Sequence, residues 1–305
     1  MDCFRNSLLL IAVLTAFVTI NPSAAKAGTP TDSLRRTSSF RDYTVRIYRG
    51  TDDEDHLEIL KSGRVVNEMT GHHLYIGYMY GDEEFAEYHH KMVSSKKIAR
   101  GSIAMGSDIT GRGVPNLVVS EWTGGAHCCL SFHIFEIGEE FREIADLDAA
   151  DAHLAHFEKR SGEKGLAFLA NDFAFAYWNT GYASSPAPEV VLRFSDGRYR
   201  LAVDLMRRPA PSDETVEGQI KQVHEEWEKD RRPPVKLWEF MLDLIYTGNA
   251  TAAWQFFEKA WVPGVPGKTE FLAEFRSQLT QSRYWEDLVS LVGDASAWGT
   301  ANETK

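Results

Sequence analysis

The hydrophobic pattern of the chain changes once, near residue 209. Before that point, short runs of β-branched and aromatic residues alternate with polar ones and are separated by turns rich in Gly, Asp and Ser, which predicts antiparallel strands. The predicted strands cover residues 43–48, 65–66, 74–78, 117–121, 131–135, 166–169, 190–194 and 199–202. After that point, apolar residues recur every three to four positions, which predicts helices. The sequence therefore predicts an α+β chain with a β-rich domain at 42–208 and a small all-helical subdomain at 209–292.

The helical subdomain divides into five predicted helices. The first covers 213–229, where apolar residues line one face and Ser212 is placed to cap the N-terminus. The others cover 235–247, 250–261, 270–281 and 283–291, and Thr269 is expected to cap the fourth of the five. Residues 237–260 place small and aromatic side chains at the offsets of a tetratricopeptide hairpin, which they weakly resemble. One hairpin is short of the three repeats that such folds usually need, so a plain helical pair is the alternative.

An internal repeat is visible in the β-rich domain. Residues 115–144 and 164–201 both read as strand, long loop, strand, tight polar turn and strand. A period of about 50 residues is typical of blade-like units, which must stack on one another to cover their apolar faces. A degenerate third copy is possible at 43–80. Two clear copies do not make a closed propeller, so the expected architecture is an incomplete, propeller-like arrangement.

The loop before the strand at 117–121 resembles the FG-GAP or VCBS repeat family of exported and cell-surface β proteins. Its sequence is Asp-x-Thr-Gly-x-Gly-x-x-Asn over residues 108–116. The resemblance implies a propeller-like unit whose aspartate-rich loops bind calcium and whose loop face binds partners. The ligand positions that it implies are Asp108, Thr110, Arg112 and Asn116.

The loop departs from the family pattern at two of these positions, since Arg112 and Asn116 each replace an acidic ligand. Calcium prefers six to eight oxygen ligands and binds more tightly when more of them are carboxylates, so calcium affinity is expected to be poor. We expect the Arg112 side chain to take the place of the ion by donating to Asp108 and to nearby carbonyls. Residual calcium binding and an ordinary turn with Arg112 in solvent are the alternatives.

The N-terminal segment of the chain indicates export, and both ends of the mature chain are expected to be flexible. Residues 1–27 read as a signal peptide, with Arg5 before an apolar segment at 8–20 and small residues before Gly28. The segment is short for a membrane span, so a mature, secreted or periplasmic chain is expected, and a retained membrane anchor is the alternative. Residues 28–41 are predicted to be a flexible leader, and residues 293–305 a flexible tail.

The net charge of the chain limits the classes of partner that we expect it to bind. The chain has 33 Lys and Arg against 44 Asp and Glu, for a formal net charge of -11. A negative protein is repelled by nucleic acid and by anionic lipid, so neither is an expected partner. No second apolar segment is long enough to cross a membrane. The expected partner is therefore a protein, a peptide or a glycan.

Two long loops carry the candidate binding residues, one after each of the strands at 117–121 and 166–169. The repeat places them at the same edge, where aromatic rings and a carboxylate suit a sugar or a peptide. The proposed surface consists of Trp122, His127, Asp172, Tyr177, Trp178 and Tyr182. An aromatic core filled beneath the loop is the alternative.

Cys128 and Cys129 are adjacent, and they remain after signal removal. Buried thiols, a strained vicinal disulfide and a thiol or metal centre with His127 are the three alternatives, although neighbours in a strand face opposite sides. No nucleophile elbow, zinc-protease helix, phosphate loop or dinucleotide fingerprint appears. We therefore expect an exported, non-enzymatic binding or scaffolding protein without a cofactor; a periplasmic thiol or metal handling protein centred on 127–129 is the alternative.

Overall fold

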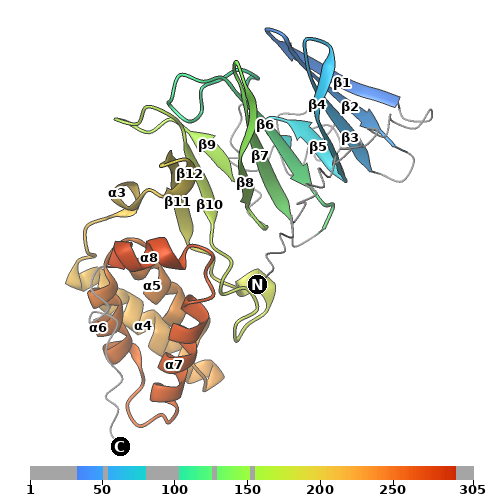
Figure 1. Ribbon diagram of the computed structural model, residues 1–305. Coiled ribbons are helices and arrows are strands. Elements are labelled where there is room, and N and C mark those ends of the chain that lie inside the picture. Colours follow the sequence, from blue (N-terminus) through green and yellow to red (C-terminus); the bar gives the residue numbers. More distant parts are fainter. Residues whose placement is uncertain (1–32, 51–53, 80–102, 126–128, 152–154, 293–305) are drawn as a thin grey trace, which may run out of the picture.

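The protein is described by a computed structural model that covers residues 33–50, 54–79, 103–125, 129–151 and 155–292. The expected signal peptide and C-terminal tail lie outside these residues. The described chain contains three four-stranded antiparallel sheets and six α-helices, so the predicted α+β class is confirmed (Figure 1). The three sheets do not close into a ring in the part of the chain that is described.

Each sheet is built from consecutive strands that pair in chain order. The first sheet comprises β1 (Ser33–Phe40), β2 (Tyr43–Arg49), β3 (Asp55–Lys61) and β4 (Arg64–Gly71). The second comprises β5 (His73–Ile76), β6 (Asn116–Trp122), β7 (Leu130–Ile137) and β8 (Phe141–Asp148). The third comprises β9 (His156–Glu158), β10 (Ala167–Asn171), β11 (Glu189–Ser195) and β12 (Arg198–Leu201). The repeat seen in the sequence corresponds to the last three strands of the second and third sheets.

Strand β1 corrects the expected leader at 28–41, because Ser33–Phe40 pairs with β2 along its whole length. Its side chains are mostly exposed or half-buried, so the strand lacks the apolar alternation that would predict it. Backbone hydrogen bonds to β2 and an ion pair with a buried carboxylate hold β1 in the sheet instead. The Arg35 guanidinium donates to the carbonyl of Leu74 and lies 3.3 Å from the buried carboxylate of Asp55.

The sheets stack face to face through two apolar cores. The first core joins the first and second sheets and includes Tyr43, Val45, Ile47, Leu57, Ile59, Leu117, Val119, Phe135 and Ile137. The second core joins the second sheet to the third, where the ring centroids of Phe132 and Phe168 lie 5.2 Å apart. The second sheet is therefore buried on both faces. This explains why residues 117–119 form a continuous apolar run rather than an alternating one.

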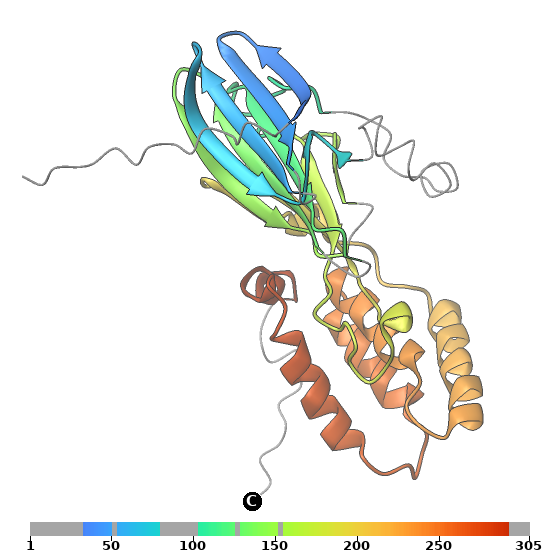
Figure 2. The ribbon, with the colours of Figure 1, turned by 90° about the vertical axis from the view of Figure 1, so that its right-hand side faces the viewer.

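The helices lie together at one end of the sheets (Figure 2). They are α3 (Val203–Met206), α4 (Asp213–Asp230), α5 (Val235–Tyr246), α6 (Ala250–Ala260), α7 (Lys268–Leu279) and α8 (Trp285–Val292). The Ser212 hydroxyl accepts from the Thr215 backbone N–H at 3.2 Å, which confirms the predicted cap of α4. The predicted cap at Thr269 was wrong, because α7 begins at Lys268 after a left-handed Gly267. Over the described residues, no helix is both long and apolar enough to cross a membrane.

Candidate functional site

Hydrogen bonds from its own backbone hold the calcium-type loop at 108–116 in its turn. The Asp108 carboxylate accepts N–H groups from Gly111 at 2.8 Å, Arg112 at 3.2 Å and Gly113 at 2.7 Å. The Thr110 hydroxyl lies 3.3 Å from the same carboxylate. These donors occupy the oxygens that the family resemblance assigns to an ion. The loop therefore keeps its turn by hydrogen bonds from N–H groups to a charged acceptor.

The Arg112 side chain does not donate to Asp108, so that expectation was wrong. Its guanidinium donates to Glu136 on β7, which also accepts from Arg142 at 2.6 Å. The same guanidinium lies over the ring of Phe194 on β11, 4.5 Å from the ring centroid. Arg112 therefore links the second sheet to the third and does not fill the loop. Only the backbone of Arg112 contacts Asp108.

The side chain of Asn116 also forms hydrogen bonds within the protein rather than binding an ion. Its side chain is buried, and its amide oxygen accepts from the Ile109 backbone N–H at 3.0 Å. Its amide nitrogen lies 3.4 Å from the carbonyl of Phe135. This residue orients the loop against β7.

The matching loop of the third sheet, between β9 and β10, gathers carbonyl oxygens around a side-chain cation. The Lys159 ammonium donates to the carbonyls of Glu163 at 2.6 Å, Lys164 at 2.7 Å and Gly165 at 3.3 Å. Gly165 lies against the second sheet's loop, where a Cβ would come within 2.5 Å of the carbonyl oxygen of Ile109. Because this loop has no aspartate pattern, the sequence did not indicate the arrangement.

Asp172 is an internal residue and not part of an open surface. It is 3% exposed, and its carboxylate accepts from the hydroxyls of Tyr246, at 2.5 Å, and Ser282. It also accepts the Ala174 backbone N–H at 2.9 Å. All these donors come from its own loop or from the helical subdomain. The carboxylate therefore fastens the loop between β10 and β11 to the helices.

Trp178 enters the helical subdomain from the same loop. Its ring centroid lies 5.3 Å from that of Trp238 and 5.3 Å from that of Phe271. The neighbouring Tyr177 is 62% exposed, and its ring contacts that of Tyr182 with centroids 5.2 Å apart, so only Trp178 of the two packs into the helical subdomain. This corresponds to the filled aromatic core that the sequence allowed as an alternative.

The other members of the proposed surface are dispersed. Trp122 stacks on His73 with ring centroids 5.2 Å apart, and His127 lies outside the described residues. Tyr182 donates a hydrogen bond to Asp151, and burial together with this bond raises the pKa of Tyr182. The expectation of one open surface from all six residues is therefore corrected, since Asp172 and Trp178 face the helices.

Cys129 forms a disulfide, which corrects the expectation of a buried free thiol at that position. Its backbone N–H donates to the Thr123 hydroxyl at 2.9 Å. The only other cysteines of the chain are Cys3 and Cys128, and both lie outside the described residues. The vicinal disulfide between Cys128 and Cys129 stays a prediction.

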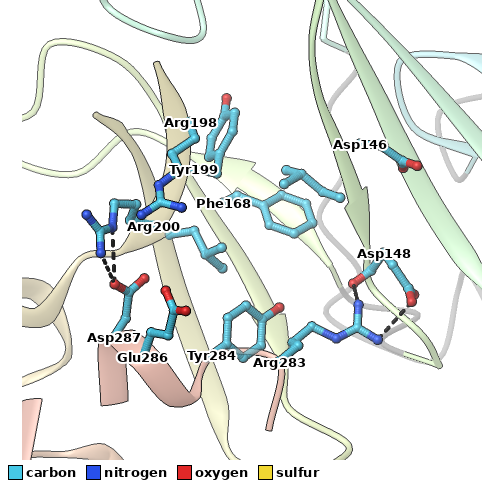
Figure 3. A pocket seen from close by; sticks show the side chains of 12 residues that line it. Asp146, Asp148, Phe168, Arg198, Tyr199, Arg200, Arg283, Tyr284, Glu286 and Asp287 are labelled. Carbon is cyan, nitrogen blue, oxygen red and sulfur yellow. Dashed lines mark hydrogen bonds and ion pairs between the residues drawn. The ribbon is translucent and has the colours of Figure 1, made fainter. Parts of the chain in front are cut away.

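A cleft of about 270 Å³ lies where β8, the third sheet and the start of α8 meet (Figure 3). Phe168 and Leu192 contribute apolar side chains from β10 and β11. The charged and aromatic residues around them are Asp146, Asp148, Arg198, Tyr199, Arg200, Arg283, Tyr284, Glu286 and Asp287. The acidic residues of β8 and the arginines of β12 stand on opposite sides, with the Phe168 ring between them.

Two ion pairs fix the walls of this cleft. Arg200 donates to the Asp287 carboxylate at 2.8 and 3.1 Å, and this interaction ties β12 to α8 and raises the pKa of Arg200. Arg283 donates to the carboxylate of Asp148 at 2.8 Å and to its carbonyl at 2.6 Å. The helical subdomain therefore contacts both walls.

Other polar groups of the cleft remain available to a ligand. Burial raises the pKa of Tyr284 to about 12, so the phenol stays protonated and can donate a hydrogen bond. Among the described residues, Arg198 and Glu286 form no ion pair. Asp146 lies 3.7 Å from the His133 imidazole, and more than half of its side chain is exposed. The Asp146 carboxylate therefore faces His133, and the cleft offers a cation from β12 and an anion from α8 above an apolar floor.

The sequence contained a signal for this cleft, which was not recognised. Asp146 and Asp148 are two residues apart on β8, and Arg198 and Arg200 have the same spacing on β12, so each pair points to one side of its strand. The two strands belong to different sheets and are separated by about 50 residues of chain. Only the packing of the two sheets brings these strands to one cleft.

Comparison with models of protein families, with curated proteins and with solved structures found no match for this chain.

Proposed function

We propose that this protein is an exported binding protein whose three sheets are blade-like units related to FG-GAP and VCBS repeats. Recognition takes place in the cleft between β8 and β12. The observation that carries the proposal is the placement at the cleft of Arg198 on β12 and Glu286 on α8, beside Phe168. Opposed charges above an apolar floor match a ligand that has both charges and an apolar group.

The ligand class that fits is a small zwitterion with an apolar side chain, such as a free amino acid or a dipeptide. Its ammonium group pairs with Glu286, and its carboxylate pairs with Arg198. Its side chain packs on Phe168 and Leu192. The volume of about 270 Å³ is near the lower limit of ligand pockets, which run from roughly 300 to 1,000 Å³, so the part of a ligand seated in the cleft is small.

The affinity is expected to be modest. Ion pairs in solvent each contribute roughly 0.2–1 kcal/mol, and burial of one apolar side chain contributes about 1.5–3 kcal/mol. These contributions sum to roughly 2–5 kcal/mol before the cost of immobilising the ligand, so a Kd weaker than about 1 mM follows. Such binding suits a ligand that is abundant outside the cell or one end of a longer peptide.

Export is supported by the apolar segment at 8–20 and by the disulfide at Cys129, because disulfides persist mainly in oxidising compartments. N-terminal sequencing of the secreted or periplasmic fraction tests it, with Gly28 expected as the first residue. A chain recovered only in the cytoplasm, with residues 1–27 intact, contradicts export.

Ligand binding is tested by NMR titration with L-leucine, leucinamide and N-acetylleucine. Leucinamide lacks the carboxylate, and N-acetylleucine lacks the ammonium group, so each should bind more weakly than leucine, by up to about fivefold. Arg198→Gln should weaken leucine binding without changing leucinamide binding. Arg64→Gln, which removes an exposed arginine from β4, is the matched control. Equal affinity of the three compounds, or no shift of cleft resonances, overturns the proposal.

A further inference from the structure

His56, Glu58 and Glu68 form a cluster on the outer face of the first sheet. His56 and Glu58 are two residues apart on β3, and Glu68 lies on β4, the edge strand. One potential metal-ligating atom from each side chain lies within 4.8 Å of the other two. The opposite face of β3 carries Leu57 and Ile59 into the apolar core, so the cluster faces away from the second sheet.

Glu58 stands directly opposite Glu68 in the β3–β4 ladder. Like charges at opposed positions destabilise a strand pair. Over the residues that the structure describes, Glu68 has no ion-pair partner to offset this repulsion. A cation between the two carboxylates removes the conflict.

The two oxygens of Glu58 have different surroundings. Oε2 accepts from the Tyr48 hydroxyl at 3.1 Å and lies 3.8 Å from the Arg46 guanidinium. Oε1 faces the His56 imidazole, at 4.0 Å from Nε2. Burial and the hydrogen bond to Glu58 raise the pKa of Tyr48, so its phenol stays a donor. Carboxylates that ligate metals are commonly held by outer hydrogen bonds of this kind.

The Nε2 atom of the His56 imidazole faces the other two side chains of the cluster. Its Nε2 is shielded from solvent, and no hydrogen-bond partner reaches it among the described residues. The side chains of His56 and Glu58 are 13% and 15% exposed. A buried polar atom without a partner costs free energy, and coordination of a metal ion satisfies it.

We propose that His56, Glu58 and Glu68 bind a divalent transition-metal ion, with Zn²⁺ as the best fit. Zinc bonds nitrogen and oxygen at about 2.0–2.2 Å, so tetrahedral ligand atoms lie roughly 3.4 Å apart. Small side-chain rotations close the present separations to that value. One imidazole with two carboxylates suits zinc, copper or nickel, whereas calcium and magnesium prefer oxygen ligands alone. Three protein ligands leave one position for water.

The Arg46 guanidinium lies 3.8 Å from Oε2 of Glu58, so its charge lowers the affinity for a metal ion without blocking Oε1. It lies on the Oε2 side of Glu58, away from the imidazole. The site therefore differs from the loops at 108–116 and 159–165 in having two facing carboxylates and a histidine nitrogen. In those loops, N–H groups or an ammonium group already satisfy the oxygens.

The test is a Zn²⁺ titration by calorimetry on metal-free, untagged protein. One zinc ion is expected to bind to this cluster, and calcium should not compete. His56→Gln and Glu68→Gln should each weaken this binding at least tenfold, whereas Glu217→Gln, at an exposed position on α4, should not change it. Zinc binding that keeps its stoichiometry and affinity in both cluster variants overturns the proposal, as does the absence of binding by the unaltered protein.

A second measurement separates loss of the site from loss of the fold. In metal-free buffer, Glu68→Gln should melt at the same temperature as the unaltered protein or higher, because the repulsion with Glu58 is gone. Zinc should raise the melting temperature of the unaltered protein but not that of this variant. An equal rise in both proteins contradicts the assignment of zinc to this cluster.

Discussion

The hydroxyl of Tyr246 on α5 donates a 2.5 Å hydrogen bond to the carboxylate of Asp172, at the base of the loop between β10 and β11. Both side chains are buried, and burial followed by the nearby carboxylate raises the pKa of Tyr246 well above its ordinary value. The bond joins the third sheet to the helical subdomain. The change of pattern near residue 209 is thus not a boundary between independent parts.

Asp172→Ala is expected to lower the free energy of unfolding by about 3 kcal/mol. The variant leaves the hydroxyls of Tyr246 and Ser282 buried without their charged acceptor. Tyr246→Phe should cost less, about 1.5 kcal/mol, because Ser282 still donates to the carboxylate. Urea unfolding measures both. A change in Asp172→Ala as small as that in the surface variant Glu217→Gln contradicts the structural role.

Trp178→Ala should destabilise the protein by about 3 kcal/mol, since it removes an aromatic ring from the cluster with Trp238 and Phe271. The neighbouring Tyr177→Ala is the matched control. Tyr177 is 62% exposed and its ring contacts only that of Tyr182 among the described rings, so its loss should cost less, about 1 kcal/mol. Thermal unfolding of the two variants checks this difference. Equal losses indicate that Trp178 does not anchor the loop.

Calcium is expected to leave the melting temperature unchanged, because backbone N–H groups occupy the Asp108 carboxylate. Asp108→Ala removes the acceptor for three such groups and should cost about 1–2 kcal/mol with or without calcium. Differential scanning fluorimetry of the unaltered protein and of Asp108→Ala, in calcium and in chelator, measures these melting temperatures. A rise of several degrees with calcium that disappears in Asp108→Ala refutes the prediction.

His133 on β7 should make stability depend on pH. Burial lowers its pKa, but Glu121, Asp146 and Glu143 outweigh that effect, so the pKa of His133 is raised above 6.5 in the folded state. A raised pKa means that the stabilisation is complete below about pH 6.5 and is lost as pH rises through the folded value. Unfolding experiments on the unaltered protein and on His133→Gln, over about pH 5.5 to 8.5, should show a difference that shrinks with rising pH. A difference that stays constant contradicts this.

Local pattern was sufficient for most of the elements. The apolar period and the cap at Ser212 predicted a helix at 213–229, and α4 covers Asp213–Asp230. Alternation predicted β2, and the repeat predicted the order of strands in the second and third sheets. These features depend on neighbours in sequence, so a single chain reveals them. Strand β1 was missed because distant groups such as Asp55 hold its polar residues.

The candidate sites depended on contacts across the fold. Aromatic residues at 171–182 are equally consistent with an open surface and with a filled core, and the helices that cover Trp178 decide between them. Likewise, the partner of Arg112 is Glu136, which lies 24 residues further along the chain. Nothing near Arg112 in sequence specifies that choice.

The sequence alone determined the class of fold, the repeat and the approximate positions of α4 to α8, because apolar periodicity acts over a few residues. Tertiary structure alone decided which charged residues meet. Strand β8 and strand β12 bring acidic and basic side chains to one cleft because their sheets stack, and Glu58 faces Glu68 because β3 and β4 pair in one register. Stacking and register follow from the burial of apolar faces in whole sheets, which no short segment encodes.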